Sequence, residues 1–287
     1  MLPLATSSWD EEEYDAIQRV VKSDRFTMGQ EVEAYEKEFA SFFGSKFAVM
    51  SNSGSSANLL AVAALFHSKR HDISVGDEVI VPAVSWSTTY YPLHQYGLKM
   101  KFVDIDQKTL NIDLDKLEEA VTDKTKMVFA VNLLGNPMDF ERLQDICNRN
   151  SLILIEDNCE SMGAKFEDKF AGTFGIAGTF SSFFSHHIST MEGGMTVTDC
   201  EEMHQLMISL RAHGWTRGLS AENLIAEISE DSFMESFRFI LPGYNLRPLE
   251  MSGAIGRAQL KKLGGIVKGR RENAETFKDC FTGIDGL

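Results

Sequence analysis

The sequence is poor in cysteine, in proline and in positive charge. Its 287 residues include 4 Cys and 6 Pro, and 28 Lys and Arg stand against 42 Asp and Glu, which gives a formal net charge of −14. Binding to nucleic acid or to an anionic membrane rests on an excess of Lys and Arg, so neither kind of partner is expected. An anionic ligand would need a local positive pocket.

The four cysteines, Cys147, Cys159, Cys200 and Cys280, are far apart and show no C-x-C or C-x-x-C spacing. Neither a metal site nor a disulfide framework is therefore predicted. No run approaches the length of about 18 apolar residues that a membrane helix needs, and no basic start followed by an apolar run marks a secretion signal. We expect a protein of the reducing cytoplasm.

What the sequence does contain is a repeated alternation of strands and helices. Expected strands lie at residues 47–50, 78–81, 101–104, 127–131 and 152–155, and expected helices at residues 58–66, 87–96, 115–121 and 140–149. This alternation predicts an α/β fold with a parallel sheet, and ligands bind such sheets at the carboxyl ends of the strands.

Different patterns flank this alternation. Asp10 is expected to cap a first helix that runs to about Ser23, and a second helix carries Val32 and Phe39 and ends near Gly44. After the alternation we expect strands at residues 179–184 and 195–198, a helix at 201–212, a polar loop at 217–235 and a helix from residue 251. The length allows a large domain at residues 1–240 and the start of a small one at residues 241–287.

Three features could bind a cofactor. Residues 52–58, Asn-Ser-Gly-Ser-Ser-Ala-Asn, precede an apolar helix and suit a phosphate, although small residues there also serve as a plain cap. Asp157 follows a buried strand, where its carboxylate is a suitable partner for a pyridinium nitrogen or is a loop acid. Trp86 follows another strand and could stack on an aromatic ring, although a lone Trp more often packs in a core.

These features, with four further segments, resemble the DegT/DnrJ/EryC1/StrS sugar aminotransferase family, which dehydrates and aminates nucleotide-linked 4-keto sugars. The further segments are residues 156–160, 172–175, 181–194 and 243–247, in the family's order. The resemblance implies the type I fold of pyridoxal phosphate enzymes, with a mostly parallel seven-stranded sheet between helices and a small C-terminal α/β domain. Family members continue past the equivalent of Leu287, so we expect that small domain to be truncated.

The family's cofactor lysine stands six residues before the glutamate of a Glu-Gly-Gly segment, and counting back six from Glu192 reaches His186. A lysine would hold pyridoxal phosphate as a Schiff base, whereas an imidazole acts only as an acid or base. The resemblance therefore implies a 3-dehydratase with His186 as its base. His187 is the rival candidate.

The resemblance also assigns the cofactor contacts. Trp86 would stack on the ring of pyridoxal or pyridoxamine 5'-phosphate, Asp157 would pair with the ring nitrogen, and Glu160 would lie near the ring's polar edge. The phosphate would be held by Gly54, Ser55 and Ser181, with Asn245 of the partner subunit, so a homodimer with shared active sites is implied.

Two branches of dehydratases occur in the family. One acts on CDP-sugars with an iron–sulfur cluster and has clustered cysteines after the Glu-Gly-Gly strand, but residues 211–243 here contain none. The other acts on GDP-4-keto-6-deoxymannose in deoxysugar (colitose) and lipopolysaccharide biosynthesis, and is similar here at residues 213–215 and 241–245. We thus expect no iron–sulfur cluster, a GDP-linked substrate and glutamate as co-substrate. Residues expected near the nucleotide sugar are Phe26, Thr27, Met28, Gly29 and His213.

Three alternatives stay open at this point. A CDP-4-keto-6-deoxyglucose 3-dehydratase would be recognised by its iron. A nucleotide-sugar aminotransferase would yield an aminated sugar, although Lys165 and Lys169 fall too early to replace the missing lysine. A truncated, non-catalytic homologue would bind cofactor or a partner without turnover.

Overall fold

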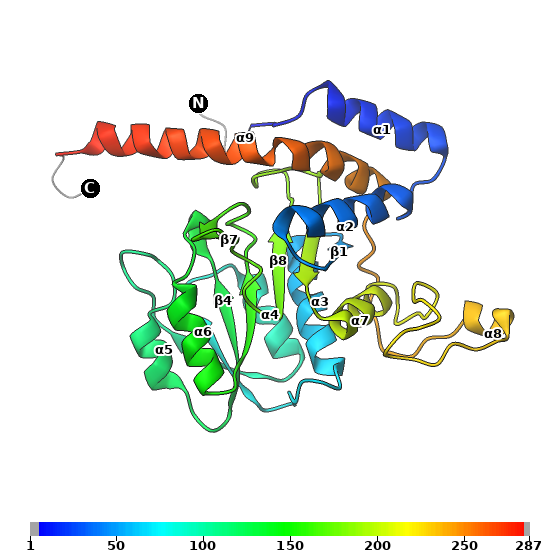
Figure 1. The fold of residues 1–287 in the computed structure, drawn as a ribbon, viewed down its shortest axis with the longest axis horizontal. Coiled ribbons are helices and arrows are strands. Elements are labelled where there is room, and N and C mark those ends of the chain that lie inside the picture. The colour runs from blue at the N-terminus through cyan, green and yellow to red at the C-terminus, as the bar shows by residue number, and fades with distance from the viewer. Residues whose placement is uncertain (1–5, 284–287) are drawn as a thin grey trace.

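The computed structural model describes residues 6–283, and a seven-stranded sheet lies at its centre (Figure 1). Its strands are β1 (Phe47–Ser51), β2 (Glu78–Pro82), β3 (Lys99–Val103), β4 (Thr125–Val131), β5 (Ile153–Asp157), β8 (Ala177–Ser181) and β9 (Gly194–Thr198), in the order β1-β9-β8-β5-β4-β2-β3. β9 runs antiparallel to both of its neighbours, and the other pairings are parallel. The predicted α/β fold with a mostly parallel seven-stranded sheet is confirmed.

Helices cover both faces of the sheet (Figure 1). One face is covered by α3 (Gly54–His67), α4 (Ser87–Gln95) and α7 (Glu201–Arg211), and the other by α5 (Leu114–Ala120), α6 (Phe140–Arg149), α2 (Gln30–Phe43) and α9 (Glu250–Phe281). Alternation along the strands assigns the faces: Val81 and Phe129 pack toward α3, whereas Ile80 and Val128 pack toward α5 and α6. Both faces of the sheet are therefore covered by buried apolar side chains, as is usual for a parallel sheet.

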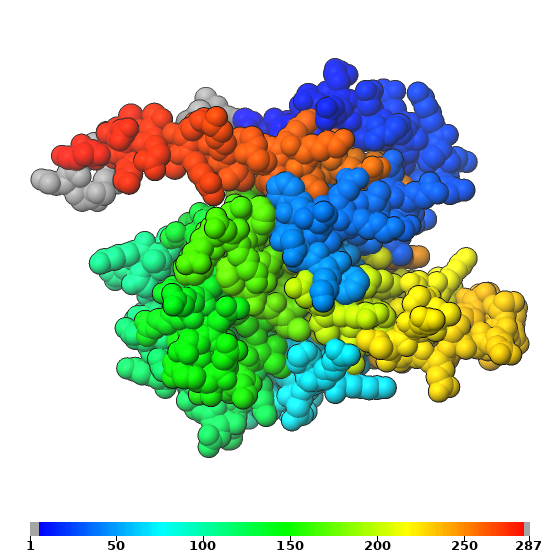
Figure 2. Space-filling view, in the orientation of Figure 1, coloured from blue at the N-terminus to red at the C-terminus, as the bar shows by residue number. Residues whose placement is uncertain are grey.

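The N-terminal helices pack along the first half of α9 (Figure 1). α1 (Glu11–Ser23) begins with the predicted cap at Asp10, which forms a complete capping box with Glu13. α2 ends at Gly44 in the left-handed conformation, also as predicted. The second half of α9 is exposed and projects from the body (Figure 2).

A second projection, which we call the arm, consists of residues 212–249 (Figure 2). The prediction of a polar loop at 217–235 is wrong at its end, where a short helix, α8 (Ser232–Ser236), forms. The side chain of Asp231 caps this helix by accepting from the N–H groups of Phe233 and Met234. Among residues 241–283 the structure has α9 and no strand, and the division into two domains stays a prediction.

Two other boundaries differ from the prediction. α3 begins at Gly54 and not at residue 58, because the Ser53 hydroxyl accepts a bond from the N–H of Ser56 and starts the helix there. β8 spans 177–181 and not 179–184, because the chain turns after Ser181, whose hydroxyl bonds the N–H of Phe183. The short strands β6 (Lys165–Phe166) and β7 (Lys169–Phe170) form a hairpin that was not predicted.

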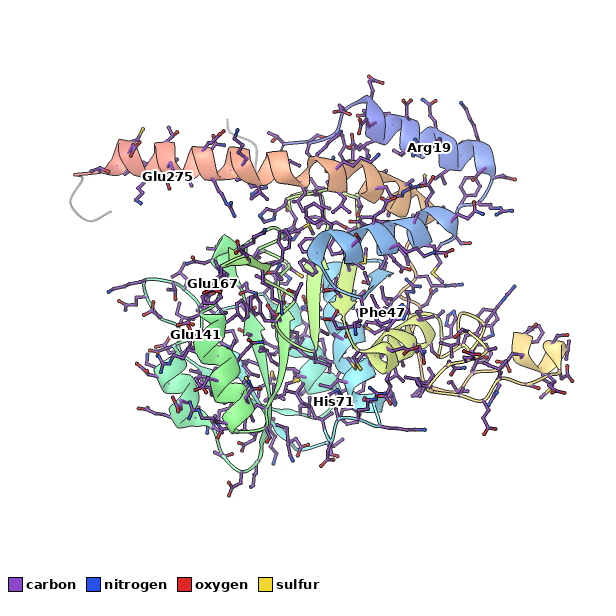
Figure 3. The ribbon with its side chains drawn as sticks, viewed as in Figure 1. Arg19, Phe47, His71, Glu141, Glu167 and Glu275 are labelled. Carbon is purple, nitrogen blue, oxygen red and sulfur yellow. The ribbon has the colours of Figure 1, made fainter. Side chains whose placement is uncertain are left out.

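The excess of acids lies at the surface, as Glu141, Glu167 and Glu275 illustrate (Figure 3). Within residues 6–283, no helix combines the length and the apolar character that crossing a membrane requires. In the same part of the chain, no group of three or more His, Cys, Asp or Glu side chains is arranged to hold a metal ion.

Candidate functional site

A cavity of about 510 Å³ opens where β4, β5 and β8 end and where α3 and α4 begin. Its position follows the rule that ligands of parallel sheets bind at the carboxyl ends of the strands. The residues that line it are Ser53, Gly54, Ser55, Asn58, Ser85, Trp86, Thr88, Val131, Asp157, Cys159, Glu160, Ser181, Phe183, Ser185, His186 and Glu192. No lysine is among these described lining residues.

Asp157 lies at the inner end of the cavity and is 5% exposed. Its Oδ2 accepts hydrogen bonds of 2.8 Å from Asn58 Nδ2 and from Thr89 Oγ1, and its Oδ1 accepts one of 3.1 Å from the N–H of Cys159. All three donors are neutral, and Asp157 takes part in none of the ion pairs found among the described residues. The carboxylate is thus held in place while its charge is left for a cationic ligand.

Glu156 precedes Asp157 but points to the opposite face of the sheet, since side chains alternate along a strand. Its carboxylate accepts bonds of 2.6–2.8 Å from the N–H groups of Gly172, Phe174 and Gly175. Burial raises the pKa of Glu156, and these backbone bonds oppose the rise. It therefore stabilises the turn at residues 172–175 and does not line the cavity.

The N-terminus of α3 packs directly against the end of β8 at the cavity wall. A Cβ on Gly54 would lie 2.6 Å from Cβ of Ser181 and 3.0 Å from Sγ of Cys159, so this approach requires glycine. Ser55 Oγ lies 2.9 Å from Thr88 Oγ1. Hydroxyls and free N–H groups at a helix N-terminus are the donors that bind a phosphate.

His186 reaches the cavity from the loop that joins β8 to β9. Its N–H bonds the carbonyl of Phe183 at 2.9 Å, and its carbonyl is 3.5 Å from Nη2 of Arg270. Burial lowers the pKa of His186, Asp157 opposes that change, and Arg270 adds to it. The lowered pKa favours the neutral imidazole, the form that can accept a proton.

His187 does not line the cavity. Its Nδ1 is buried without a hydrogen-bond partner among the described residues. Burial, with Arg270 and His186 nearby, lowers its pKa to about 4. Of the two candidates for the base, only His186 lies beside Asp157 in the cavity.

The remaining lining residues form the rim. Trp86 is 69% exposed at the mouth and offers an open indole face. Glu160 accepts a bond of 3.3 Å from the N–H of Leu134, and burial raises its pKa, with Asp157 adding to the rise. Burial also raises the pKa of the Cys159 thiol, which keeps it neutral.

The cavity thus brings together seven of the predicted residues, and the others lie elsewhere. Those together are Gly54, Ser55, Trp86, Asp157, Glu160, Ser181 and His186. Asn245 and His213 belong to the exposed arm, and Phe26–Gly29 lie at the start of α2, where Thr27 bridges to Leu249. In one chain these three groups do not contact the cavity.

The prediction missed the residues that position Asp157, namely Asn58, Thr89 and Ser85. Asn58 lies one helical turn after Gly54 and so shares the face of α3 that looks at the sheet, and Thr89 lies in the first turn of α4. Ser85 Oγ is 2.7 Å from Thr89 Oγ1. Asn58, a polar residue at the start of the apolar run of α3, was the available signal.

Known proteins share this arrangement. GDP-4-keto-6-deoxy-D-mannose 3-dehydratase of Yersinia pseudotuberculosis is 61% identical over 281 residues, covering 98% of this chain and 72% of the relative. A solved GDP-4-keto-6-deoxymannose-3-dehydratase with a trapped PLP–glutamate geminal diamine matches with a TM-score of 0.97 at 60% identity, over 99% of this chain and 74% of the other. A histidine-to-asparagine variant of an enzyme of that name, with bound GDP-perosamine, matches with a TM-score of 0.96 at 60% identity, again over 99% of this chain and 74% of the other.

The match extends to the family as a whole. The family description "DegT/DnrJ/EryC1/StrS aminotransferase family" fits residues 7–287. This family match, the relatives at 61% identity and the type I fold of the solved structures agree with one another. The chain belongs to the DegT/DnrJ/EryC1/StrS aminotransferase family.

Proposed function

We propose that this protein removes the C3 hydroxyl of GDP-4-keto-6-deoxymannose, using pyridoxal or pyridoxamine 5'-phosphate and regenerating the amine form with glutamate. The observation that carries the proposal is that His186 shares a cavity, with no lysine among its described lining residues, with Asp157, Trp86 and Ser181, to which the family resemblance assigns cofactor contacts. The identity of 61% to a 3-dehydratase and the PLP–glutamate adduct in a structural relative support it.

The residues present fit this cofactor. Asp157 offers a buried, oriented carboxylate with no cationic partner in the described chain, which suits a protonated pyridine nitrogen. Gly54, Ser55 and Ser181 would hold the phosphate at the N-terminus of α3, and Trp86 would cover the ring. When bound, the cofactor supplies an amine for the sugar ketone and a ring that takes up electrons.

The chain's own contribution to the chemistry is proton transfer. A neutral imidazole accepts a proton at a ring nitrogen and returns it later, and such acid–base catalysis contributes about 10²–10⁴-fold. The lowered pKa of His186 favours the accepting form at neutral pH. Because His186 cannot bind the cofactor covalently, non-covalent contacts alone must retain it.

We also propose a cytoplasmic homodimer in which Asn245 of the partner subunit completes the phosphate site. Asn245 is exposed on the arm, and its Oδ1 accepts a hydrogen bond of 3.0 Å from Arg247 Nε. The arm also exposes Phe233, Phe237 and Phe239 to more than half of their area. The four cysteines are free thiols, which suits a reducing compartment.

The test is mass spectrometry of GDP-4-keto-6-deoxymannose after incubation with the protein, pyridoxal phosphate and glutamate. We expect a 3-deoxy keto-sugar together with 2-oxoglutarate. An amino-sugar product would instead identify an aminotransferase, and turnover confined to CDP-4-keto-6-deoxyglucose would identify the other dehydratase branch. Absence of any reaction, with cofactor bound in the same sample, would favour a non-catalytic homologue.

His186→Asn and His187→Asn separate the two candidates for the base. His186→Asn should lower kcat by about 10²–10⁴-fold, the usual contribution of a general base. His187→Asn, which changes a side chain outside the cavity, should keep most of the wild-type kcat. The assignment would be wrong if the two variants exchanged these results, or if His186→Lys kept full dehydratase turnover.

A further inference from the structure

The loop that carries His186, residues 182–193, has no regular structure, so its position depends on a few anchors. At its base, the N–H of Ser182 bonds the carbonyl of Gly193, and the N–H of Thr190 bonds the carbonyl of Ser182, each at 2.9 Å. At its outer end, Ile188 is fully buried in the core formed with α2 and α9. Between these points lies the peptide of Ser189, three residues from His186.

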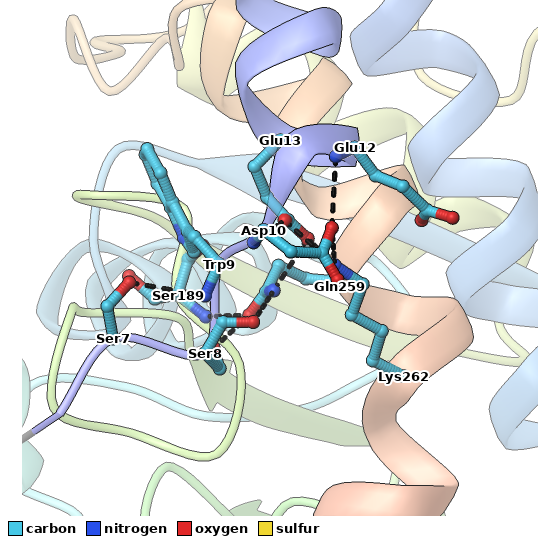
Figure 4. Close-up of polar contacts among 9 residues, drawn as sticks. All are labelled: Ser7, Ser8, Trp9, Asp10, Glu12, Glu13, Ser189, Gln259 and Lys262. Carbon is cyan, nitrogen blue, oxygen red and sulfur yellow. Dashed lines mark hydrogen bonds and ion pairs between the residues drawn. The ribbon is translucent and has the colours of Figure 1, made fainter.

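Both backbone groups of Ser189 bond side chains from distant parts of the chain (Figure 4). Its N–H donates to Gln259 Oε1 of α9 at 3.0 Å, and its carbonyl accepts from Trp9 Nε1 at 2.9 Å. Gln259 is fully buried. The loop is therefore held at one residue, through the peptide groups on either side of its Cα.

The orientation of the Gln259 amide is fixed by charge. Its Nε2 donates to Glu13 Oε1 at 2.7 Å, and this buried carboxylate also pairs with Lys262 Nζ at 2.8 Å through both of its oxygens (Figure 4). Rotating the amide by half a turn would place its oxygen against the carboxylate and its NH₂ against the N–H of Ser189. Both contacts are repulsive, so Oε1 must face Ser189.

We propose that Gln259, oriented by Glu13 and Lys262 and assisted by Trp9, is a positioning residue that holds the imidazole of His186 in the cavity beside Asp157. This inference rests on the proposed function, in which His186 moves the proton. Gln259 acts through the Ser189 peptide and does not line the cavity. Since misplacing a catalytic group by about 1 Å costs on the order of 10²-fold in rate, the effect should appear in kcat.

The experiment compares three variants of the whole chain. Gln259→Met removes the acceptor for Ser189 and should lower kcat by about tenfold to 10²-fold. The exchange Glu13→Gln with Gln259→Glu keeps an acceptor for the N–H of Ser189 and reverses the bond between residues 13 and 259, while it loses one contact with Lys262 and the contact with the Ser8 carbonyl. It should recover most of the kcat that Gln259→Met loses. Asp139→Ala removes the exposed cap of α6 and should lower stability without changing kcat.

A positioning role predicts that KM for the sugar and Kd for pyridoxal phosphate stay unchanged while kcat falls. It also predicts an effect that can be measured without turnover, by NMR of protein with ¹³C-labelled histidine. The His186 signal is assigned as the one that is absent from the spectrum of His186→Asn. In Gln259→Met this signal should shift and should titrate with a different pKa. The double variant should return that signal to its wild-type position. Should Gln259→Met fail to fold, Trp9→Phe, which removes the bond to the Ser189 carbonyl and keeps an aromatic ring beside Tyr14, replaces it in both measurements.

Unchanged kcat per folded molecule and an unchanged His186 signal in Gln259→Met would overturn the inference. A loss of kcat in Gln259→Met that the double variant does not recover would also overturn it. Failure of the proposed function looks different, because the wild type itself would then yield no 3-deoxy sugar. The NMR comparison would still decide whether Gln259 positions His186.

Discussion

Asp157→Asn should weaken the binding of pyridoxal phosphate by about 30-fold to 5,000-fold. The change keeps the shape of the side chain and removes its charge. Losing one partner of a buried, hydrogen-bonded charge pair costs roughly 2–5 kcal/mol, and each 1.4 kcal/mol is about tenfold in Kd. Asp157 is 5% exposed, so water cannot take over the role of the lost carboxylate.

The same substitution should also destabilise the cofactor-free protein. Asp157 accepts bonds from Asn58 and Thr89 at one oxygen and from the N–H of Cys159 at the other. In either orientation, the NH₂ group of an asparagine would meet one of these donors. An unpaired buried donor costs about 1–3 kcal/mol, which a chemical denaturation curve of the cofactor-free protein will show.

Thr89→Val is the matched control, because it removes one of the same hydrogen bonds but keeps the charge of Asp157. Its stability loss should be similar, whereas its Kd for pyridoxal phosphate should rise by less than about tenfold. Kd is measured by equilibrium dialysis, with the cofactor read by absorbance. If Asp157→Asn bound the cofactor as tightly as Thr89→Val, the pairing of Asp157 with the pyridine nitrogen would be refuted.

Two further predictions concern Gly54 at the N-terminus of α3 and the dependence of stability on pH. Gly54→Ala should cost about 1–3 kcal/mol of unfolding free energy and weaken cofactor binding, since its Cβ would lie 2.6 Å from Cβ of Ser181. Gly265→Ala, in open space on α9, should instead stabilise by about 0.5–1 kcal/mol, and equal effects in denaturation would contradict the argument. Burial lowers the pKa of His204 to about 4, so the unfolded state binds the proton first and unfolding free energy should fall by about 3 kcal/mol between pH 6.5 and 4. His204→Phe, which keeps the stacking on Phe47, should remove that loss, and an unchanged pH profile would disprove it.

The sequence predicted which residues meet at the site better than it predicted the hydrogen bonds between them. Because parallel strands end at one edge, residues that follow β5, β8 and β2 had to meet there, and Asp157, Ser181 and Trp86 do. The opposite directions of Glu156 and Asp157 were also implied by alternation along a strand. What periodicity cannot give is the partner of each polar group, such as Thr89 for Asp157.

The largest gap between sequence and structure is the order of the strands. β1 pairs with β9 and not with β2, so residues near 50 and 195 become neighbours. The bond between Ser189 and Gln259 likewise spans 70 positions. Both contacts depend on how whole elements pack, and no local pattern of hydrophobic or polar residues contains that information.

The replacement of a lysine by His186 divides the work of the site between two kinds of structure. In the proposed function, retention of the cofactor would fall to Asp157 and the N-terminus of α3, which belong to the sheet and its helices. Proton transfer would fall to a loop that bonds α9 and the N-terminal segment. Changes at Asp157 should therefore alter Kd, and changes at Gln259 should alter kcat. If Gln259→Met and Asp157→Asn affected Kd and kcat in the same proportion, this division would be wrong, and the loop and the sheet would have to be treated as one unit.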